Sequence, residues 1–110
     1  MALQSLRGHL DVLVLAALRA GPAHGYALIE RLAATSGGHF DLPEGTVYPA
    51  LHKLERAELI ASTWDDSSGK RRRNYRLTRK GRVELAHQID DWQQLATVMS
   101  RLLNNPIREV

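Results

Sequence analysis

The sequence has no cysteine among its 110 residues, which excludes disulfide scaffolds, thiol nucleophiles, iron–sulfur clusters and cysteine-ligated zinc. Long apolar runs are also missing. The longest, Val12 to Leu18, is far shorter than the roughly 20 residues that span a membrane, and Met1–Leu6 lacks the basic start of a signal peptide. We expect a soluble, cytoplasmic protein with one small core and no membrane association.

Signatures of catalysis are scarce as well. The five histidines are dispersed, and no two stand three or four residues apart on one helix face, so no metal site is expected. No glycine-rich phosphate loop or serine elbow is present. The acidic pairs Asp65-Asp66 and Asp90-Asp91 are adjacent residues whose side chains diverge in a strand or a helix. We therefore expect neither a cofactor nor an enzymatic activity.

Basic side chains, in contrast, are concentrated in one place. The chain carries 15 Lys and Arg against 12 Asp and Glu, a formal charge of +3. Residues 67–83 hold eight of these basic side chains and no acidic one, so the rest of the chain is net acidic. Such a patch indicates a polyanionic partner, with a solvated loop as the alternative. The eight are Lys70, Arg71, Arg72, Arg73, Arg76, Arg79, Lys80 and Arg82.

Three helices are predicted before the basic segment. Apolar residues at three- and four-residue intervals indicate a helix over about 3–20, which the Gly21-Pro22 pair ends. A second, shorter helix is expected from about His24 to Thr35, and paired glycines follow it.

The third helix is expected over 46–56. Thr46 would be its N-cap, and Pro49 would lie in the first turn, where a missing N–H costs nothing. Three apolar side chains would then face the core, and the polar ones would face outward. The inward set is Val47, Leu51 and Leu54; the outward set is Tyr48, Pro49, His52, Lys53 and Arg56.

A β-hairpin follows. Residues 60–65 and 72–77 alternate and are rich in β-branched and aromatic side chains, with a turn of polar residues between them. The hairpin therefore has a basic tip and a basic second strand. Arg76 could pair with Asp65 or Asp66 across it.

The last segment is predicted to be one long helix, from an N-cap at Thr78 to about Asn104. Its apolar residues alternate at spacings of four and three, as in a coiled-coil seam. A second copy of the chain is the expected partner of this seam; the alternative is that the helix folds back on its own domain. We expect a homodimer formed by Leu6, Leu10, Leu85, Ile89, Trp92, Ala96, Met99 and Leu103.

Three cations, Arg79, Lys80 and Arg82, stand in the first turn of that helix. Each opposes the helix macrodipole by roughly 0.3–1 kcal/mol at exposed positions. An external anion would relieve this cost, so the conflict indicates a binding surface.

Helix, helix, helix and basic hairpin is the element order of a winged helix-turn-helix, a mainly α (α+β) fold. We expect this DNA-binding domain over 1–78 and a C-terminal dimerisation helix with its tail over 79–110. In such domains the third helix enters the major groove, and the hairpin, called the wing, reaches the backbone or the minor groove.

Four sequence blocks resemble the PadR family of transcriptional regulators. They occur in the family's order between residues 6 and 81, and Gly-Thr-Val-Tyr-Pro-Ala-Leu is the most specific stretch. The short C-terminal helix is similar to the family branch with a single dimerisation helix. The blocks are LRGHL at 6–10, GPAHGY at 21–26, LPEGTVYPALHKLE at 42–55, and YRLT at 75–78 followed by Gly81.

The resemblance implies a homodimeric repressor that binds near-palindromic, double-stranded operator DNA and is released by a small aromatic or hydrophobic effector. Family members usually carry glycine where Glu58 stands, just after the third helix. A non-glycine residue in a left-handed cap is unfavourable by about 1 kcal/mol. We expect a different helix exit here, or slight strain.

Candidate DNA-binding residues come from the third helix and the wing. Tyr48, His52 and Lys53 have polar atoms that can reach bases or phosphates, and the resemblance adds Thr46 and Pro49. The wing cations favour phosphate. Tyr26 would either contact a phosphate or pack in the core. The wing set is Lys70, Arg71, Arg72 and Arg73.

Trp92 is large for a tightly packed seam. In a multidrug-responsive member of the family the matching tryptophan stacks on planar ligands, so the resemblance implies an effector site of Trp92, Ile89 and Ala96. Core packing is the alternative.

A module that binds proteins or RNA through the basic wing is the alternative function. The sequence lacks the aromatic stacking platform of single-strand binders, which argues against RNA.

Overall fold

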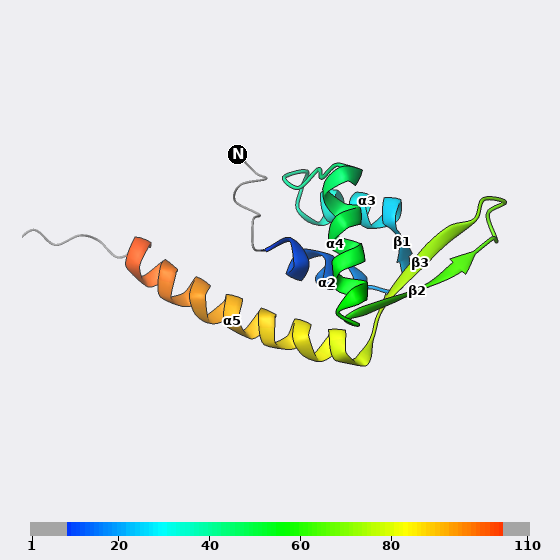
Figure 1. Ribbon diagram of the computed structural model, residues 1–110. Helices are drawn as coiled ribbons and strands as arrows, with labels where there is room; N and C mark the ends of the chain where they lie inside the picture. Colours follow the sequence, from blue (N-terminus) through cyan, green and yellow to red (C-terminus); the bar gives the residue numbers. More distant parts are fainter. Residues whose placement is uncertain (1–8, 105–110) are drawn as a thin grey trace, which may run out of the picture.

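Three short helices pack around one another, a hairpin projects from one side, and a long helix leaves from the hairpin's base (Figure 1). The computed structural model describes residues 9–104. The arrangement is the predicted winged helix-turn-helix. In chain order the elements are α2 (Leu10–Leu18), β1 (Ala23–His24), α3 (Gly25–Thr35), α4 (Glu44–Arg56), β2 (Ile60–Asp65), β3 (Arg72–Leu77) and α5 (Arg79–Asn104).

The core lies where α2, α3 and α4 meet the base of the hairpin. Val47, Leu51 and Leu54 of α4 are buried, as their spacing predicts, and Ala50 joins them. Burial of such side chains is the main stabilising contribution in a domain of this size. The core therefore holds the inner face of α4 and leaves its outer face free for other contacts. The side chains with almost no exposed surface are Tyr75, Leu15, Leu28, Leu51, Leu54, Ile60, Val14 and Val47.

The hairpin has the predicted bounds, and a third strand extends it. β2 and β3 pair antiparallel, with Trp64 opposite Arg73 and Asp65 opposite Arg72. β1 pairs with the other edge of β3. Sequence patterning missed β1, because two residues are too few to show alternation.

The end of α2 is held by a side chain of α3. Arg31 donates hydrogen bonds from Nη1 to the carbonyl oxygens of Ala17, at 2.7 Å, and Gly21, at 2.9 Å. Gly21 has φ +136°, a conformation that favours glycine. The helix ends at Leu18, two residues before the predicted end, and the Gly21-Pro22 pair follows as expected. The first part of the helix predicted over 3–20, including the dimerisation candidate Leu6, lies outside the described residues.

The predicted N-cap of α4 was wrong by three residues. The N-cap is Pro43, and Thr46 lies inside the first turn, where its N–H donates to the Pro43 carbonyl at 3.0 Å. Glu44 fits the first turn because its charge favours the positive end of the helix dipole. Pro49 is consequently an interior residue, and the hydrogen bond that another residue would donate to the Gly45 carbonyl is absent there.

The end of α4 confirms the expected strain at Glu58, which has φ +63°. The Leu59 N–H donates to the Leu54 carbonyl and the Glu58 N–H to the Glu55 carbonyl, both at 3.0 Å. This pair of bonds defines a Schellman motif with Glu58 at the left-handed position. The helix thus ends as glycine-capped helices do, with a side chain where glycine is preferred.

The start of α5 is packed against that same exit. Thr78 is the N-cap, as predicted: its Oγ1 accepts a hydrogen bond from the Gly81 N–H at 3.0 Å. Thr78 Oγ1 also donates to the Glu58 carbonyl at 2.7 Å. A Cβ on Gly81 would lie 1.9 Å from the Leu59 carbonyl oxygen. Only glycine allows this approach.

One of the three cations at the start of α5 has a partner within the chain. Lys80 donates from Nζ to the Ala57 carbonyl at 3.0 Å, at the negative end of the α4 dipole. For Lys80, therefore, the cost of its position is offset by α4 rather than by an external anion.

The predicted seam on α5 divides into two parts. Leu85 belongs to the domain core and Ile89 packs against it, as does Leu10 of α2, so assigning Leu85 to the dimer surface was wrong. The reason is that α5 packs against α2 along its first turns. Beyond this contact the apolar side chains are exposed. They are Trp92, Leu95, Val98, Met99, Leu102 and Leu103, which we call the α5 stripe.

Replacing Glu58 by glycine should stabilise the fold by about 1 kcal/mol, because the left-handed conformation costs a residue with a Cβ about that much. The urea midpoint should rise while the m-value stays constant. Glu58→Ala is the matched control, since it removes the charge and keeps the Cβ. An equal gain from both variants would contradict strain as the cause.

Candidate nucleic-acid interface

The outer face of α4 and the start of α3 present aromatic and basic side chains together. Tyr26, the second residue of α3, is 57% exposed, so packing in the core is excluded for it. Tyr48 lies against the start of α3: a Cβ on Gly25 would come within 2.5 Å of its hydroxyl oxygen. His52 is exposed one turn further along α4. Gly25 thus lets the two helices approach closely enough to bring these side chains to one surface.

Lys53 is also exposed, yet it already has a partner. Its Nζ lies 2.9 Å from a carboxylate oxygen of Asp11 in α2. An exposed ion pair contributes little to stability, so Lys53 can exchange Asp11 for another anion at small cost.

The wing carries an aromatic side chain that sequence analysis did not select. Trp64 of β2 is 53% exposed. The guanidinium carbons of Arg71 and Arg73 lie 4.5 Å and 4.7 Å from the centre of a Trp64 ring. These distances are within the range of cation–π attraction. The sequence signal that could have identified Trp64 is the pairing of the two predicted strands, which places Trp64 directly opposite Arg73.

His24 ties β1 to the outer end of the wing, next to its turn. Its Nε2 lies 3.4 Å from Asp65, and its Nδ1 lies 3.2 Å from the Arg73 carbonyl. Hydrogen bonds from Ser67 lower the pKa of the Asp65 carboxyl, with further lowering by His24 and Arg72. The suggested pairing of Arg76 with Asp65 or Asp66 was wrong, because the register places Arg76 opposite Ala61.

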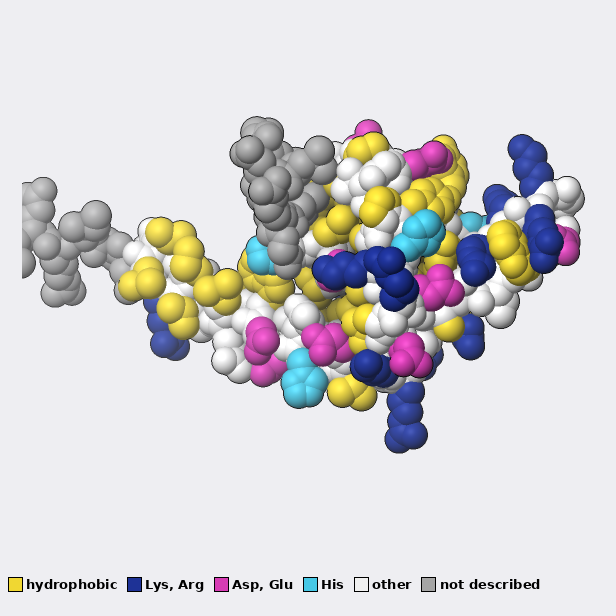
Figure 2. Space-filling view, viewed as in Figure 1, with side chains coloured by type: hydrophobic (Ala, Val, Ile, Leu, Met, Phe, Trp, Pro, Cys, Tyr) yellow, Lys and Arg dark blue, Asp and Glu magenta, His cyan; other side chains and the backbone are white. Residues whose placement is uncertain are grey.

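These elements enclose an open cavity of about 310 Å³. Burial raises the pKa of the Tyr75 hydroxyl at its floor, and Glu55 raises it further. No acidic residue lines the cavity, so it suits an anion such as phosphate. Lys and Arg side chains gather over the wing beside it (Figure 2). The lining is His24, Gly25, Tyr26, Tyr48, His52, Trp64, Arg71, Arg72, Arg73 and Tyr75.

The structure brings together most, not all, of the predicted DNA-binding residues. The cavity lining does not include Thr46, Pro49 and Lys53, which lie on α4, or Lys70, which lies in the turn at the wing tip. Among the described residues, no group of three or more potential ligands could hold a metal ion. Within the same part of the chain, every helix is too short or too polar to cross a membrane.

Comparison with known proteins gives one consistent family. The profile of the transcriptional regulator PadR-like family matches residues 14–87. A transcriptional regulator of Mycobacterium tuberculosis is 34% identical over 73 residues, which are 66% of this chain and 65% of the relative.

Solved structures agree with the family match. A PadR family transcriptional regulator from Eggerthella lenta is 37% identical, with a TM-score of 0.82 over 96% of this chain and 91% of that one. A PadR-like transcriptional regulator from Bacillus cereus is 29% identical, also with a TM-score of 0.82, over 94% and 99%.

Trp64→Leu should weaken binding of duplex DNA about five- to thirtyfold, because two exposed cation–π contacts of roughly 0.5–1 kcal/mol each orient the arginines. Fluorescence anisotropy with a labelled duplex measures this. Trp64→Phe keeps a ring and should lose less. If Trp64→Leu binds the duplex as tightly as the parent while circular dichroism shows an intact fold, the two contacts do not orient Arg71 and Arg73 for DNA binding.

Proposed function

Because the chain belongs to the transcriptional regulator PadR-like family, we propose that it is a cytoplasmic, homodimeric repressor of a near-palindromic operator. Family membership makes it a DNA-binding regulator and not an enzyme. It favours DNA binding over the alternative of a protein- or RNA-binding module. The proposal concerns the finer points: which residues contact DNA, how two copies assemble, and what releases them.

The proposed DNA-binding mode places α4 in the major groove and the wing on the flanking backbone. The cavity between α3, α4 and the wing is the observation that carries it, because its cationic and aromatic lining contains no acid. Tyr48 and His52 face the bases or phosphates, and Lys53 exchanges Asp11 for a phosphate. The backbone contacts come from Tyr26, Thr46, Pro49, Lys70, Arg71, Arg72 and Arg73.

The proposed dimer uses the α5 stripe. Met99 is 43% exposed and Leu102 is 72% exposed, and apolar side chains gather along the outer part of α5 (Figure 2). An exposed apolar stripe on a helix is a typical site of association. Ala96 lies on the same segment, and Ile89 sits where the stripe meets the core.

The effector is proposed to be a small aromatic or hydrophobic molecule that contacts Trp92, Ile89 and Ala96. Trp92 is 43% exposed, and its ring centroid lies 5.1 Å from that of His9. In a Trp64→Phe background, planar ligands should quench Trp92 fluorescence. The hypothesis fails if no planar ligand changes either this emission or operator binding.

A dimer that neutralises 6–10 phosphates should lose roughly 10³–10⁵-fold in affinity between 50 and 200 mM salt. We expect this steepness together with preference for a palindromic operator duplex, selected from random sequence, over a scrambled duplex. Electrophoretic mobility shift at several salt concentrations measures both.

His52→Ala should reduce discrimination between the two duplexes, whereas Arg72→Gln should weaken both about equally. Arg101→Gln, in the last turn of α5, is the matched charge control and should change neither. Equal affinity for palindromic and scrambled duplexes would refute operator recognition.

Met99→Asp together with Leu102→Asp should convert the dimer to monomers, because two charges would enter an apolar contact. Sedimentation equilibrium measures the mass, and Val83→Asp, an exposed residue outside the α5 stripe, is the control. A dimer that survives the double substitution would place the interface elsewhere.

A further inference from the structure

Aromatic side chains from three separate elements meet at the cavity between α3, α4 and the wing, which we call the wing cavity. Tyr26 comes from α3, Tyr48 from α4 and Trp64 from β2. Tyr26 is 57% exposed and Trp64 is 53% exposed, so core packing does not occupy either ring. The wing cavity therefore presents free aromatic surface together with positive charge.

Duplex DNA leaves part of this aromatic surface unused. The faces of paired bases are covered by the neighbouring pairs, and a duplex presents phosphates and base edges to a protein. In the proposed DNA-binding mode the phosphates bind the arginines of the wing, and the exposed part of the Trp64 ring has no partner. An unpaired base, in contrast, has a free face that stacks on aromatic rings.

Positive charge lies directly beside the Trp64 ring. The guanidinium carbons of Arg71 and Arg73 are 4.5 Å and 4.7 Å from the centre of a Trp64 ring. A guanidinium that stacks on a ring keeps its N–H donors free for a phosphate. Helix α3 also begins at this cavity, without a side-chain cap, and the positive end of its dipole adds to the attraction. A base on the indole would therefore hold its phosphate next to two arginines.

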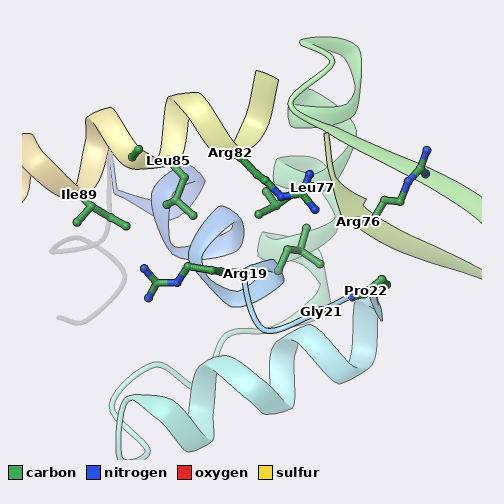
Figure 3. A pocket seen from close by; sticks show the side chains of 10 residues that line it. Arg19, Gly21, Pro22, Arg76, Leu77, Arg82, Leu85 and Ile89 are labelled. Atoms are coloured by element: carbon green, nitrogen blue, oxygen red, sulfur yellow. The ribbon is translucent and has the colours of Figure 1, made fainter. Parts of the chain in front are cut away.

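The wing cavity is distinct from the other basic surface of the same segment. Arg76 and Arg82 border a separate pocket between α2, β3 and α5 (Figure 3). The arginines that line the wing cavity are Arg71, Arg72 and Arg73, and no acidic residue lines it. Arg76 thus provides a matched control on the same strand for any effect of Arg73.

We propose that the wing cavity binds a free nucleotide. The base stacks on Trp64 beside Tyr26, and the phosphate accepts hydrogen bonds from Arg71 and Arg73. The cavity volume of about 310 Å³ is at the lower end of the range for small-molecule sites, which suits a nucleoside monophosphate better than a large cofactor.

A nucleotide in the wing cavity would compete with the duplex for one surface, a step that rests on the proposed DNA-binding mode. Arg71 and Arg73 cannot bind both phosphates at once. Release of DNA would then follow from direct displacement, without a change in the shape of the dimer. In this respect the nucleotide differs from the effector proposed at Trp92, which lies on α5 and outside the wing cavity.

Calorimetric titration of the intact protein with AMP, ribose 5-phosphate and adenosine tests the proposal. AMP should bind at least about fivefold more tightly than ribose 5-phosphate, because stacking of one base on an aromatic ring contributes that factor or more. AMP should also bind about tenfold more tightly than adenosine, which lacks the charge-assisted hydrogen bonds of the phosphate.

Variants separate the contribution of the ring from that of the charge. Trp64→Leu should bind AMP only as tightly as ribose 5-phosphate, and Trp64→Phe should keep part of the difference. Arg73→Gln should weaken binding of AMP and of ribose 5-phosphate but not of adenosine. Arg76→Gln and Trp92→Phe should bind all three compounds like the parent.

Equal affinity of the parent for AMP and ribose 5-phosphate would overturn the proposal. So would a preference for AMP that survives Trp64→Leu or is lost in Trp92→Phe. A single-stranded trinucleotide tests the source of the nucleotide. If it binds more tightly than AMP by about tenfold or more, the gain expected from further stacked bases, the cavity serves single strands and not free nucleotides.

A mobility shift with the labelled operator duplex separates this proposal from operator recognition. AMP should displace the duplex at concentrations at which ribose 5-phosphate, of equal charge, does not. If the parent discriminates between duplexes but does not bind AMP, only the nucleotide site fails. If the parent binds AMP but does not discriminate between duplexes, operator recognition fails and the nucleotide site remains.

Discussion

The structure depends on one close contact, between the backbone of Gly81 and the carbonyl of Leu59. Three elements meet there. Helix α4 ends at Arg56, three residues before Leu59, β2 begins at Ile60, directly after it, and Gly81 lies in the first turn of α5. Thr78 bonds both to the exit of α4 and to the start of α5. A change at this contact would therefore move α4, the wing and α5 relative to one another.

The same junction depends on the left-handed conformation of the residue at position 58. The left-handed turn at Glu58 directs the chain from α4 into β2. The Glu58 carbonyl oxygen accepts a hydrogen bond from the Thr78 hydroxyl. The strain is local, whereas the position of three elements depends on the turn.

Local chemistry was readable from the sequence, and long-range packing was not. The hairpin bounds, the Thr78 cap and the inward face of α4 follow from alternation, capping and helical spacing. The start of α4 was misassigned because a threonine three residues before a proline resembles an N-cap, while the N-cap position is held by Pro43, which makes no side-chain capping hydrogen bond. Leu85 could not be placed, because a heptad spacing does not tell whether a helix faces a partner or its own domain. The contacts of Arg71 and Arg73 with the Trp64 ring, which make Trp64 part of the candidate interface, are seen only in the structure.

In the proposed DNA-binding mode, the partners of the basic side chains within the chain set the order in which these side chains meet DNA. Arg71 and Arg73 rest on a neutral indole ring, so they meet a phosphate with their charge already in place and no anion to displace. Lys53 rests on the carboxylate of Asp11 and must leave it first. The arginines of the wing can therefore contact any duplex at once. The contact of Lys53 in α4 requires that its ion pair with Asp11 first breaks. DNA would first bind at the wing. Contacts from α4 to the DNA sequence would follow where a group in the groove binds Lys53 more strongly than Asp11 does.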